Sequence, residues 1–338
     1  MKKRKPSYFA VLLGLGIALI AAVAVSATLG RYPITVREIG GILLSQVFDI
    51  EKFWKPVAES LFLQSRLPRI LLACLVGCSL SAAGASYQGI FQNPMAAPDI
   101  LGASGGAAFG AALAILLGLG KSMIIALAFA SSLICVGLVI FVGNRAKGKR
   151  VVGLILAGIM ISSLFSSGTS YIKLVADPND KLPAITYWLM GSLNGTMPSD
   201  VRFAVIPMAL GLIPLFLLRW RINLLTLGDA EARTMGVNAP CLRVIVILCA
   251  TLITAASVAV SGVIGWIGLV IPHLARRMVG NDYRKLLPAS MLLGALFLLI
   301  VDDVSRNAMA TEIPIGILTA VIGAPFFLYL MTKGDERI

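Results

Sequence analysis

Long apolar stretches alternate with short polar connections along the chain. A helix needs about 20 mostly apolar residues to cross the hydrocarbon core of a bilayer, and about ten stretches come near this length. We expect spanning helices at 9–29, 69–90, 97–117, 122–143, 151–173, 201–218, 241–261, 264–279, 286–302 and 314–332. Hardly any loop separates the expected spans 241–261 and 264–279, which predicts a tight hairpin at Ser261-Gly262. The pattern predicts an all-α polytopic membrane protein with about ten transmembrane helices.

Composition supports this interpretation. Hydrophobic residues make up 58% of the chain and charged residues 13%, whereas a soluble domain has about 25% charged residues. We therefore expect a single transmembrane domain over residues 1–338. The first apolar stretch, 9–29, exceeds the roughly 7–15 residues of a signal peptide's apolar core, so we read it as a helix that stays in the membrane.

The formal net charge is +13, and most basic residues lie in alternate connections. Because Lys and Arg are enriched in cytoplasmic loops, we place both termini and the connection 219–240 in the cytoplasm. The connections 30–68 and 174–200 then lie outside. A nucleic-acid-binding protein would gather its positive charges on one soluble face, and this pattern does not. We expect membrane lipid around the chain and no nucleic-acid partner.

Residues with catalytic or metal-binding chemistry are sparse. His273 is the only histidine and has no cluster of other ligands in the sequence, whereas zinc needs three or four. Asp302 and Asp303 are adjacent, so on a helix they would not face each other, and we expect them to be solvated at the membrane interface rather than to form a proton relay. We expect no catalytic residue, cofactor or metal in this chain.

The segment FQNPMAAPDILGASGGAAFG interrupts two apolar stretches. Pro94 stops a helix and moves Asn93 out of helical geometry. Non-helical backbone at membrane depth is tolerated where it lines a water-filled path, so we interpret Asn93, Pro94 and Met95 as part of a cytoplasmic gate. Gly102 and Gly106 begin a stripe of small residues, which suits either a path lining or close helix packing within one subunit.

The cytoplasmic segment NLLTLGDAEARTMGVN, residues 223–238, is expected to form two short helices. Gly228 separates them, Asp229 is a good N-cap for the second, and Gly236 a good stop after it. The second helix has one strongly apolar residue, Met235, so lipid anchoring would be weak and we favour a protein partner. We assign this contact to Leu225, Gly228, Asp229, Ala232, Met235 and Gly236.

Four segments, 65–107, 223–237, 261–282 and 312–331, resemble the FecCD-type permeases. These are membrane subunits of type II ABC importers for iron–siderophore complexes, haem, vitamin B12 and some oxyanions. The resemblance implies the type II permease fold, a homodimer with its path along the two-fold axis, two cytoplasmic ATPase subunits that hold ATP and Mg, and an external substrate-binding protein. It also implies that residues 223–238 are coupling helices, although Ala stands where the EAA–Gly pattern of other importers has Glu.

Three arginines lie near the outer surface in this topology. Arg66 and Arg69 are three residues apart at the start of the second helix, and Arg306 lies in the connection before the last helix. They suit interfacial anchors whose side chains reach the headgroups. They also suit pairing with acidic residues of a docked binding protein, which the resemblance supports.

We therefore expect a permease in the cytoplasmic membrane of a bacterium or archaeon that translocates a metal chelate delivered by an external binding protein. An oxyanion importer remains open. An ion-coupled secondary transporter would need buried ionisable residues at mid-membrane, and we find none in mid-span. An intramembrane enzyme would need a metal or nucleophile cluster, which the sequence also lacks.

Overall fold

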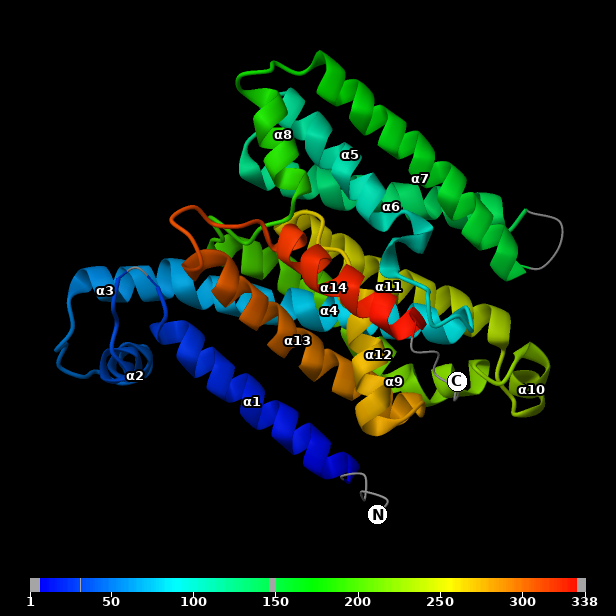
Figure 1. Ribbon diagram of the computed structural model, residues 1–338, viewed down its shortest axis with the longest axis horizontal. Helices are drawn as coiled ribbons and strands as arrows, with labels where there is room; N and C mark the ends of the chain where they lie inside the picture. The colour runs from blue at the N-terminus through cyan, green and yellow to red at the C-terminus, as the bar shows by residue number, and fades with distance from the viewer. Residues whose placement is uncertain (1–6, 31, 146–149, 333–338) are drawn as a thin grey trace.

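The computed structural model describes residues 7–30, 32–145 and 150–332, and the secondary structure of these residues is entirely helical (Figure 1). The long helices are α1 (Tyr8–Thr28), α4 (Leu67–Ile90), α6 (Lys121–Gly143), α7 (Arg150–Val175), α9 (Pro198–Leu225), α11 (Ala239–Ser261) and α13 (Tyr283–Asn307). The shorter helices are α2 (Val36–Ser45), α3 (Pro56–Leu61), α5 (Ala103–Leu116), α8 (Lys181–Leu189), α10 (Asp229–Thr234), α12 (Ile267–Val279) and α14 (Ile315–Thr332). A π-helical turn, η1 (Phe62–Arg66), joins α3 to α4, and a 3₁₀ turn, η2 (Pro98–Leu101), precedes α5.

Each of the ten expected spans coincides with a helix. Seven of the described helices are long and apolar enough to cross a membrane, and α5 and the apolar part of α14 are shorter. With 13 residues, α12 is only about 20 Å long, less than the roughly 30 Å of a hydrocarbon core. The polytopic, all-helical prediction is confirmed, and three of the expected spans are short.

Helix α4 forms the centre of the bundle and is buried over almost its whole length, with α9, α11, α12 and α13 packed around it (Figure 1). Glycines make these contacts close. A Cβ atom on Gly77 would meet the carbonyl oxygen of Gly294, and one on Gly84 would meet that of Gly268. Small residues let helix backbones touch in this way, so α4 is held by backbone-to-backbone contacts on two sides.

The structure interrupts one of the expected spans and shortens another. The prediction of one helix over 97–117 was wrong, because η2 ends at Gly102, whose left-handed φ of 79° separates it from α5. The expected tight hairpin at Ser261-Gly262 was also wrong. Residues 262–266 form a loop, and α12 packs against α4 and α13. The starts of η2 and α12 meet in the core, where the ring of Pro98 lies against Gly268. Such irregular backbone is tolerated within a membrane when protein surrounds it.

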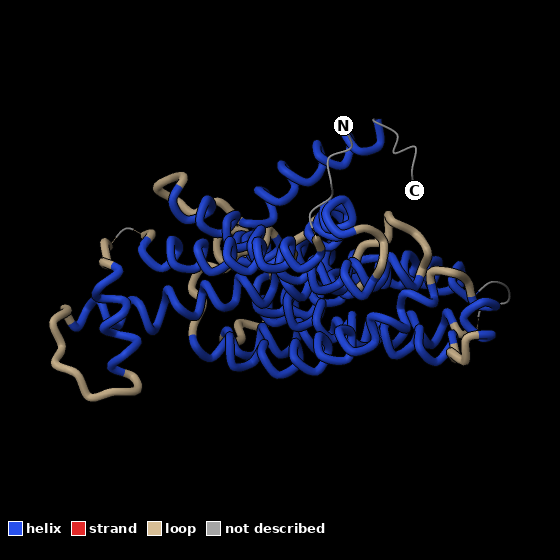
Figure 2. The backbone as a smooth tube through the Cα atoms, turned by 90° about the horizontal axis from the view of Figure 1, so that it is seen from below, coloured by secondary structure: helices blue, strands red, loops and turns tan. Residues whose placement is uncertain are grey.

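The ends of the bundle differ in what they carry. Helices α2, α3 and α8 lie at one end and α10 at the other (Figure 1), while Figure 2 shows helices running along the length of the molecule with loops gathered toward both ends. Lys285 Nζ lies 5.8 Å from the ring centroid of Tyr8, so α1 and α13 begin together. Exposed apolar side chains such as Leu210 (62%) and Leu217 (70%) on α9 form the kind of surface that faces lipid.

Candidate docking pocket, translocation path and coupling helix

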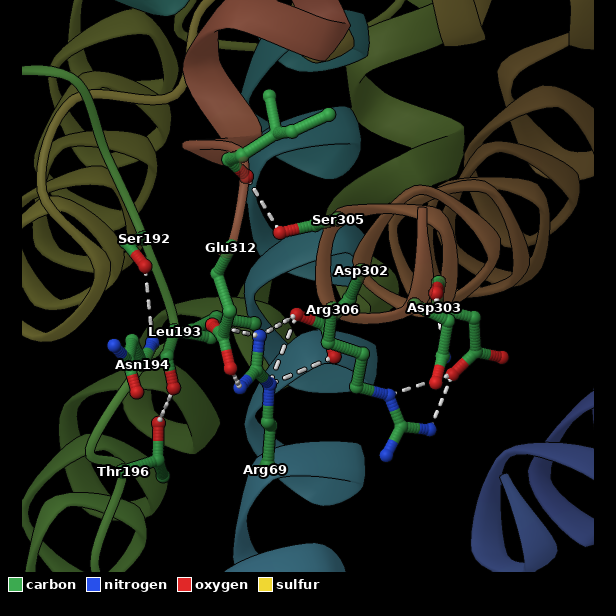
Figure 3. A network of polar contacts seen from close by, with 12 residues as sticks. Arg69, Ser192, Leu193, Asn194, Thr196, Asp302, Asp303, Ser305, Arg306 and Glu312 are labelled. Carbon is green, nitrogen blue, oxygen red and sulfur yellow. Dashed lines mark hydrogen bonds and ion pairs between the residues drawn. The ribbon is translucent and has the colours of Figure 1, made fainter. Parts of the chain in front are cut away.

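A polar pocket of about 660 Å³ opens at the end of the bundle that carries α2, α3 and α8. One guanidinium on its wall, that of Arg69, binds two carboxylates (Figure 3). Its Nε and Nη2 donate to Asp302 at 2.8–3.0 Å, and its Nη1 and Nη2 donate to Glu312 at 3.0 Å. The Asp302 side chain is 0% exposed, so the expectation that it is solvated at the membrane interface was wrong.

The other two outer arginines are also bound within the chain. Arg66 donates to the backbone carbonyls of Ala27 and Tyr32, which fixes the segment after α1. Arg306 belongs to the last turn of α13 rather than to a loop, and donates to Asp303 and to Ser26 of α1.

Arg66, Arg69 and Arg306 are therefore not free surface charges. Arg66 and Arg69 are each 8% exposed. All three nevertheless line the pocket. Their role in docking a binding protein stays a prediction.

At the opposite end, α4 stops where the sequence predicts. The helix ends at Ile90, and Gln92 has a left-handed φ of 52°. The Asn93 side chain accepts a hydrogen bond from the backbone N–H of Met95 at 2.9 Å, a side-chain turn typical of Asn. Pro94 lies within this turn, and Met95 is 44% exposed. The turn is confirmed, and its action as a gate stays a prediction.

The small-residue stripe after this turn has a packing role. A Cβ atom on Gly106 would clash with Cys135 and the Ser131 carbonyl of α6, so Gly106 is covered by α6. This contact supports the alternative of close packing within one subunit, and the assignment of Gly106 to the path stays a prediction. Gly102 is covered from two helices, since a Cβ atom there would meet Ser162 of α7 and Cys135 of α6.

The segment 223–238 contains one short helix, not two. The expected first helix is the last turn of α9, which includes the buried Leu225. Helix α10 follows, with Ala232 0% exposed and Met235 58% exposed. Gly236 follows α10 with φ +77°, as its predicted stop requires.

The predicted N-cap of α10 was wrong. Gly228, with φ +123°, is the N-cap, and Asp229 is the first residue of the helix. The Asp229 carboxylate instead accepts from Arg243 Nη2 at 2.7 Å and Nη1 at 3.2 Å.

Two functional candidates were missed by the sequence reasoning, Arg243 and Gln92. Arg243 is 4% exposed, and its Nε also donates to the backbone carbonyl of Ile90 at 3.2 Å. Gln92 Nε2 donates to the carbonyl of Leu225 at 2.8 Å. Both link α4 and its turn to the segment around α10. An arginine near the start of an apolar helix was the available signal.

Helix α7 exposes four serines that the sequence reasoning also missed, among exposed apolar side chains such as Leu164 (69%) and Leu174 (80%). Ser163, Ser166, Ser167 and Ser170 are exposed along it. The opposite side of α7 packs on the broken helix, where a Cβ atom on Gly158 would meet the Ile100 carbonyl. Among the described residues, no group of three or more His, Cys, Asp or Glu side chains could hold a metal ion.

An interrupted helix in the core of a multi-span bundle, beside a helix with exposed serines, is an arrangement found in membrane transport proteins. The chain belongs to the FecCD transport family, whose model matches residues 18–333. Members of this family are permease subunits of ABC transporters and are not enzymes themselves.

Three similar proteins span nearly the whole chain or most of it. The molybdate import system permease protein MolB of Haemophilus influenzae is 40% identical over 327 residues, covering 97% of this chain and 96% of its own length. A probable iron chelatin transport system permease of Helicobacter pylori is 45% identical over 273 residues, covering 81% and 82%. A solved inward-facing metal-chelate type ABC transporter superposes with a TM-score of 0.86 at 38% identity, covering 96% of this chain and 99% of its own.

Proposed function

We propose that this chain is the membrane subunit of an ATP-driven importer, that it works as a homodimer, and that it translocates a metal chelate of the iron–siderophore, haem or vitamin B12 class. The exposed serine face of α7 is the observation that carries the proposal. Polar residues in membrane helices usually face a bundle interior or a water-filled cavity. A two-fold pairing that faces the α7 helices of two copies toward each other would give these serines such a cavity.

The partners follow from this proposal. Two ATPase subunits that hold ATP and Mg would bind at the end with α10, which we place in the cytoplasm with both termini. A substrate-binding protein would dock at the opposite, external end, over the pocket lined by Arg66, Arg69 and Arg306.

A continuous set of contacts supports coupling between α10 and the path. Asp229 at the start of α10 binds Arg243, and Arg243 binds the last residue of α4, Ile90. The turn with Asn93, Pro94 and Met95 follows Ile90, and η2 beyond it packs on α7. A displacement of α10 would thus reach this turn, the proposed gate, and then the serine-bearing helix.

Cysteine chemistry tests the path. Ser166→Cys and Ser170→Cys should react with a hydrophilic thiol reagent and crosslink between copies in nanodiscs, with blocked transport as a result. The matched control is Leu210→Cys on the apolar face of α9, which is 62% exposed in the chain and should stay unreactive in lipid. If Ser166→Cys and Ser170→Cys transporters are active but, like Leu210→Cys, neither react with the reagent nor crosslink, α7 does not line the path.

The substrate class rests on relatives. Those named for iron chelatin, cobalamin and hemin favour a metal chelate, as does the superposed metal-chelate type transporter. MolB, similar over 97% of the chain, favours molybdate as the second candidate. Uptake of labelled ferric siderophore, haem, cobalamin and molybdate into vesicles with the complete transporter decides between them. ATP-dependent uptake of molybdate alone would overturn the metal-chelate proposal.

A further inference from the structure

The two carboxylates on Arg69 are not equivalent. Asp302 belongs to α13 and is fully buried, whereas the Glu312 side chain is 22% exposed and lies in the connection between α13 and α14. Figure 3 shows the Arg69 guanidinium between them. Asp302 occupies the Nε edge from inside the bundle. Glu312 occupies the outer edge, Nη1 and Nη2, beside the pocket.

A carboxylate on this outer edge is exchangeable in a way that Asp302 is not. A guanidinium edge binds one carboxylate with two parallel hydrogen bonds, so a second carboxylate can enter only when the first leaves. Asp302 is 0% exposed and does not line the pocket, so an entering carboxylate cannot reach its edge of the guanidinium. Glu312 can turn into the pocket and be solvated there.

We propose that Glu312 is a resident carboxylate that holds Arg69 until an Asp or Glu side chain of the docked binding protein takes its place. The proposal rests on the proposed function, because it requires an external protein partner. Before docking, Glu312 keeps the outer edge of Arg69 paired and the connection folded over the pocket. On docking, the partner's carboxylate makes the same two hydrogen bonds, and Glu312 is released.

The release acts on α14. The connection that carries Glu312 is held to α13 by two hydrogen bonds, Ile313 N–H to the Ser305 carbonyl at 3.1 Å and Ser305 Oγ–H to the Ile313 carbonyl at 2.6 Å. Glu312 and Ile313 are adjacent, and α14 begins at Ile315. Freeing Glu312 therefore removes one of the constraints that set the start of α14, a helix with an exposed outer face that includes Val321 (65%).

The decisive experiment measures docking of the cognate binding protein to the complete transporter in nanodiscs. Glu312→Gln removes the competing carboxylate and should tighten docking by about tenfold, the size of one charge-assisted hydrogen bond. The matched control is Glu59→Gln on α3, because Glu59 is an acid of the same end whose partners are Lys52 and Trp54 and which does not line the pocket. Glu312→Asp keeps the charge and should dock like wild type.

A second readout follows the released connection. The five native cysteines are replaced first. A membrane-impermeant maleimide should then label Ile313→Cys faster when the binding protein is docked than when it is absent. When Glu312→Gln is added, labelling should reach the faster rate even without the binding protein. If the wild-type transporter docks the binding protein but Glu312→Gln and Glu59→Gln dock it with the same affinity, the exchange is overturned. The same holds if docking does not change the labelling rate of Ile313→Cys. In both cases the permease function still stands. Failure of the wild-type transporter to dock any binding protein would instead refute the proposed function.

Discussion

Replacing Arg243 by Met should uncouple ATP hydrolysis from transport while the helices stay folded. Met fills a similar volume but removes the hydrogen bonds to Asp229 and to the Ile90 carbonyl. The ion pair with Asp229, whose side chain is 47% exposed, is discounted for solvent and contributes about 1 kcal/mol. The unpaired Ile90 carbonyl costs about 1–2 kcal/mol more.

The sum, about 2–3 kcal/mol, corresponds to roughly a 30- to 150-fold change in the equilibrium between α10 held by Arg243 and α10 displaced. Arg243→Lys keeps the charge but cannot bind both partners with a planar fork, so it should be partly uncoupled. Vesicles with the complete transporter would report the ratio of substrate imported to ATP hydrolysed. We expect this ratio to fall severalfold or more for Arg243→Met, with ATPase activity retained.

The control is Arg277→Met, because Arg277 is an exposed arginine at the end of α12 in the cytoplasmic half of the predicted topology. It removes the same charge without touching Asp229 or Ile90. A normal import-to-ATP ratio for Arg243→Met, at a thermal stability equal to that of Arg277→Met, would refute the contact route from α10 to α4.

Three further predictions concern single residues. Gly236→Val should uncouple transport, because φ is +77° there and a left-handed conformation costs a side-chain-bearing residue about 1–2 kcal/mol; normal uptake would contradict this. Gly84→Ala should lower the thermal midpoint sharply, since its Cβ would strike the Gly268 carbonyl, whereas Gly14→Ala meets nothing within 4 Å and should not. Asp302→Asn should destabilise the fold by about 1.5–3 kcal/mol, because charge-assisted hydrogen bonds between Arg69 and a buried carboxylate are lost while the pair with Glu312 remains; an unchanged midpoint in a thermal melt would count against it.

Helix positions were readable because the signal is local. A run of apolar residues must find an apolar environment wherever it lies, and a stop such as Pro94 acts on its own neighbours. Gly236 was placed correctly for the same reason. Gly102 was read as part of a continuous helix, because a glycine within an apolar run gives no sign of whether its φ will be positive. The N-cap of α10 was misassigned because Asp229 had a stronger partner, Arg243, on another helix.

The outer pocket was partly readable and its contacts were not. The positions of Arg66 and Arg69 near one surface follow from the topology. Their partners do not, because Asp302 lies 233 positions from Arg69 and Glu312 lies 243 positions away. The adjacent residues Asp302 and Asp303 give no indication in the sequence that Asp302 is buried against Arg69 of a distant helix. The serine face of α7 was visible in the sequence, but only the packing of the other helices shows which side of α7 remains exposed.

The contacts at both ends of α4 limit which helices can carry motion. Arg69 joins its outer end to α13, and the Ile90 carbonyl joins its inner end to Arg243. Glycine contacts with α12 and α13 lock its middle, where sliding by a fraction of an ångström would drive backbone atoms together. Because interiors this tightly packed are hardly compressible, the middle of α4 is suited to a fixed axis, and a displacement of α10 would pass to the turn after Ile90 rather than along the helix. The elements free to respond are those with exposed faces, α14 next to Glu312 at the outer end and α7 behind η2 at the inner end. In a homodimer arranged around α7, docking and ATP hydrolysis would then reach the same path from opposite ends through different helices.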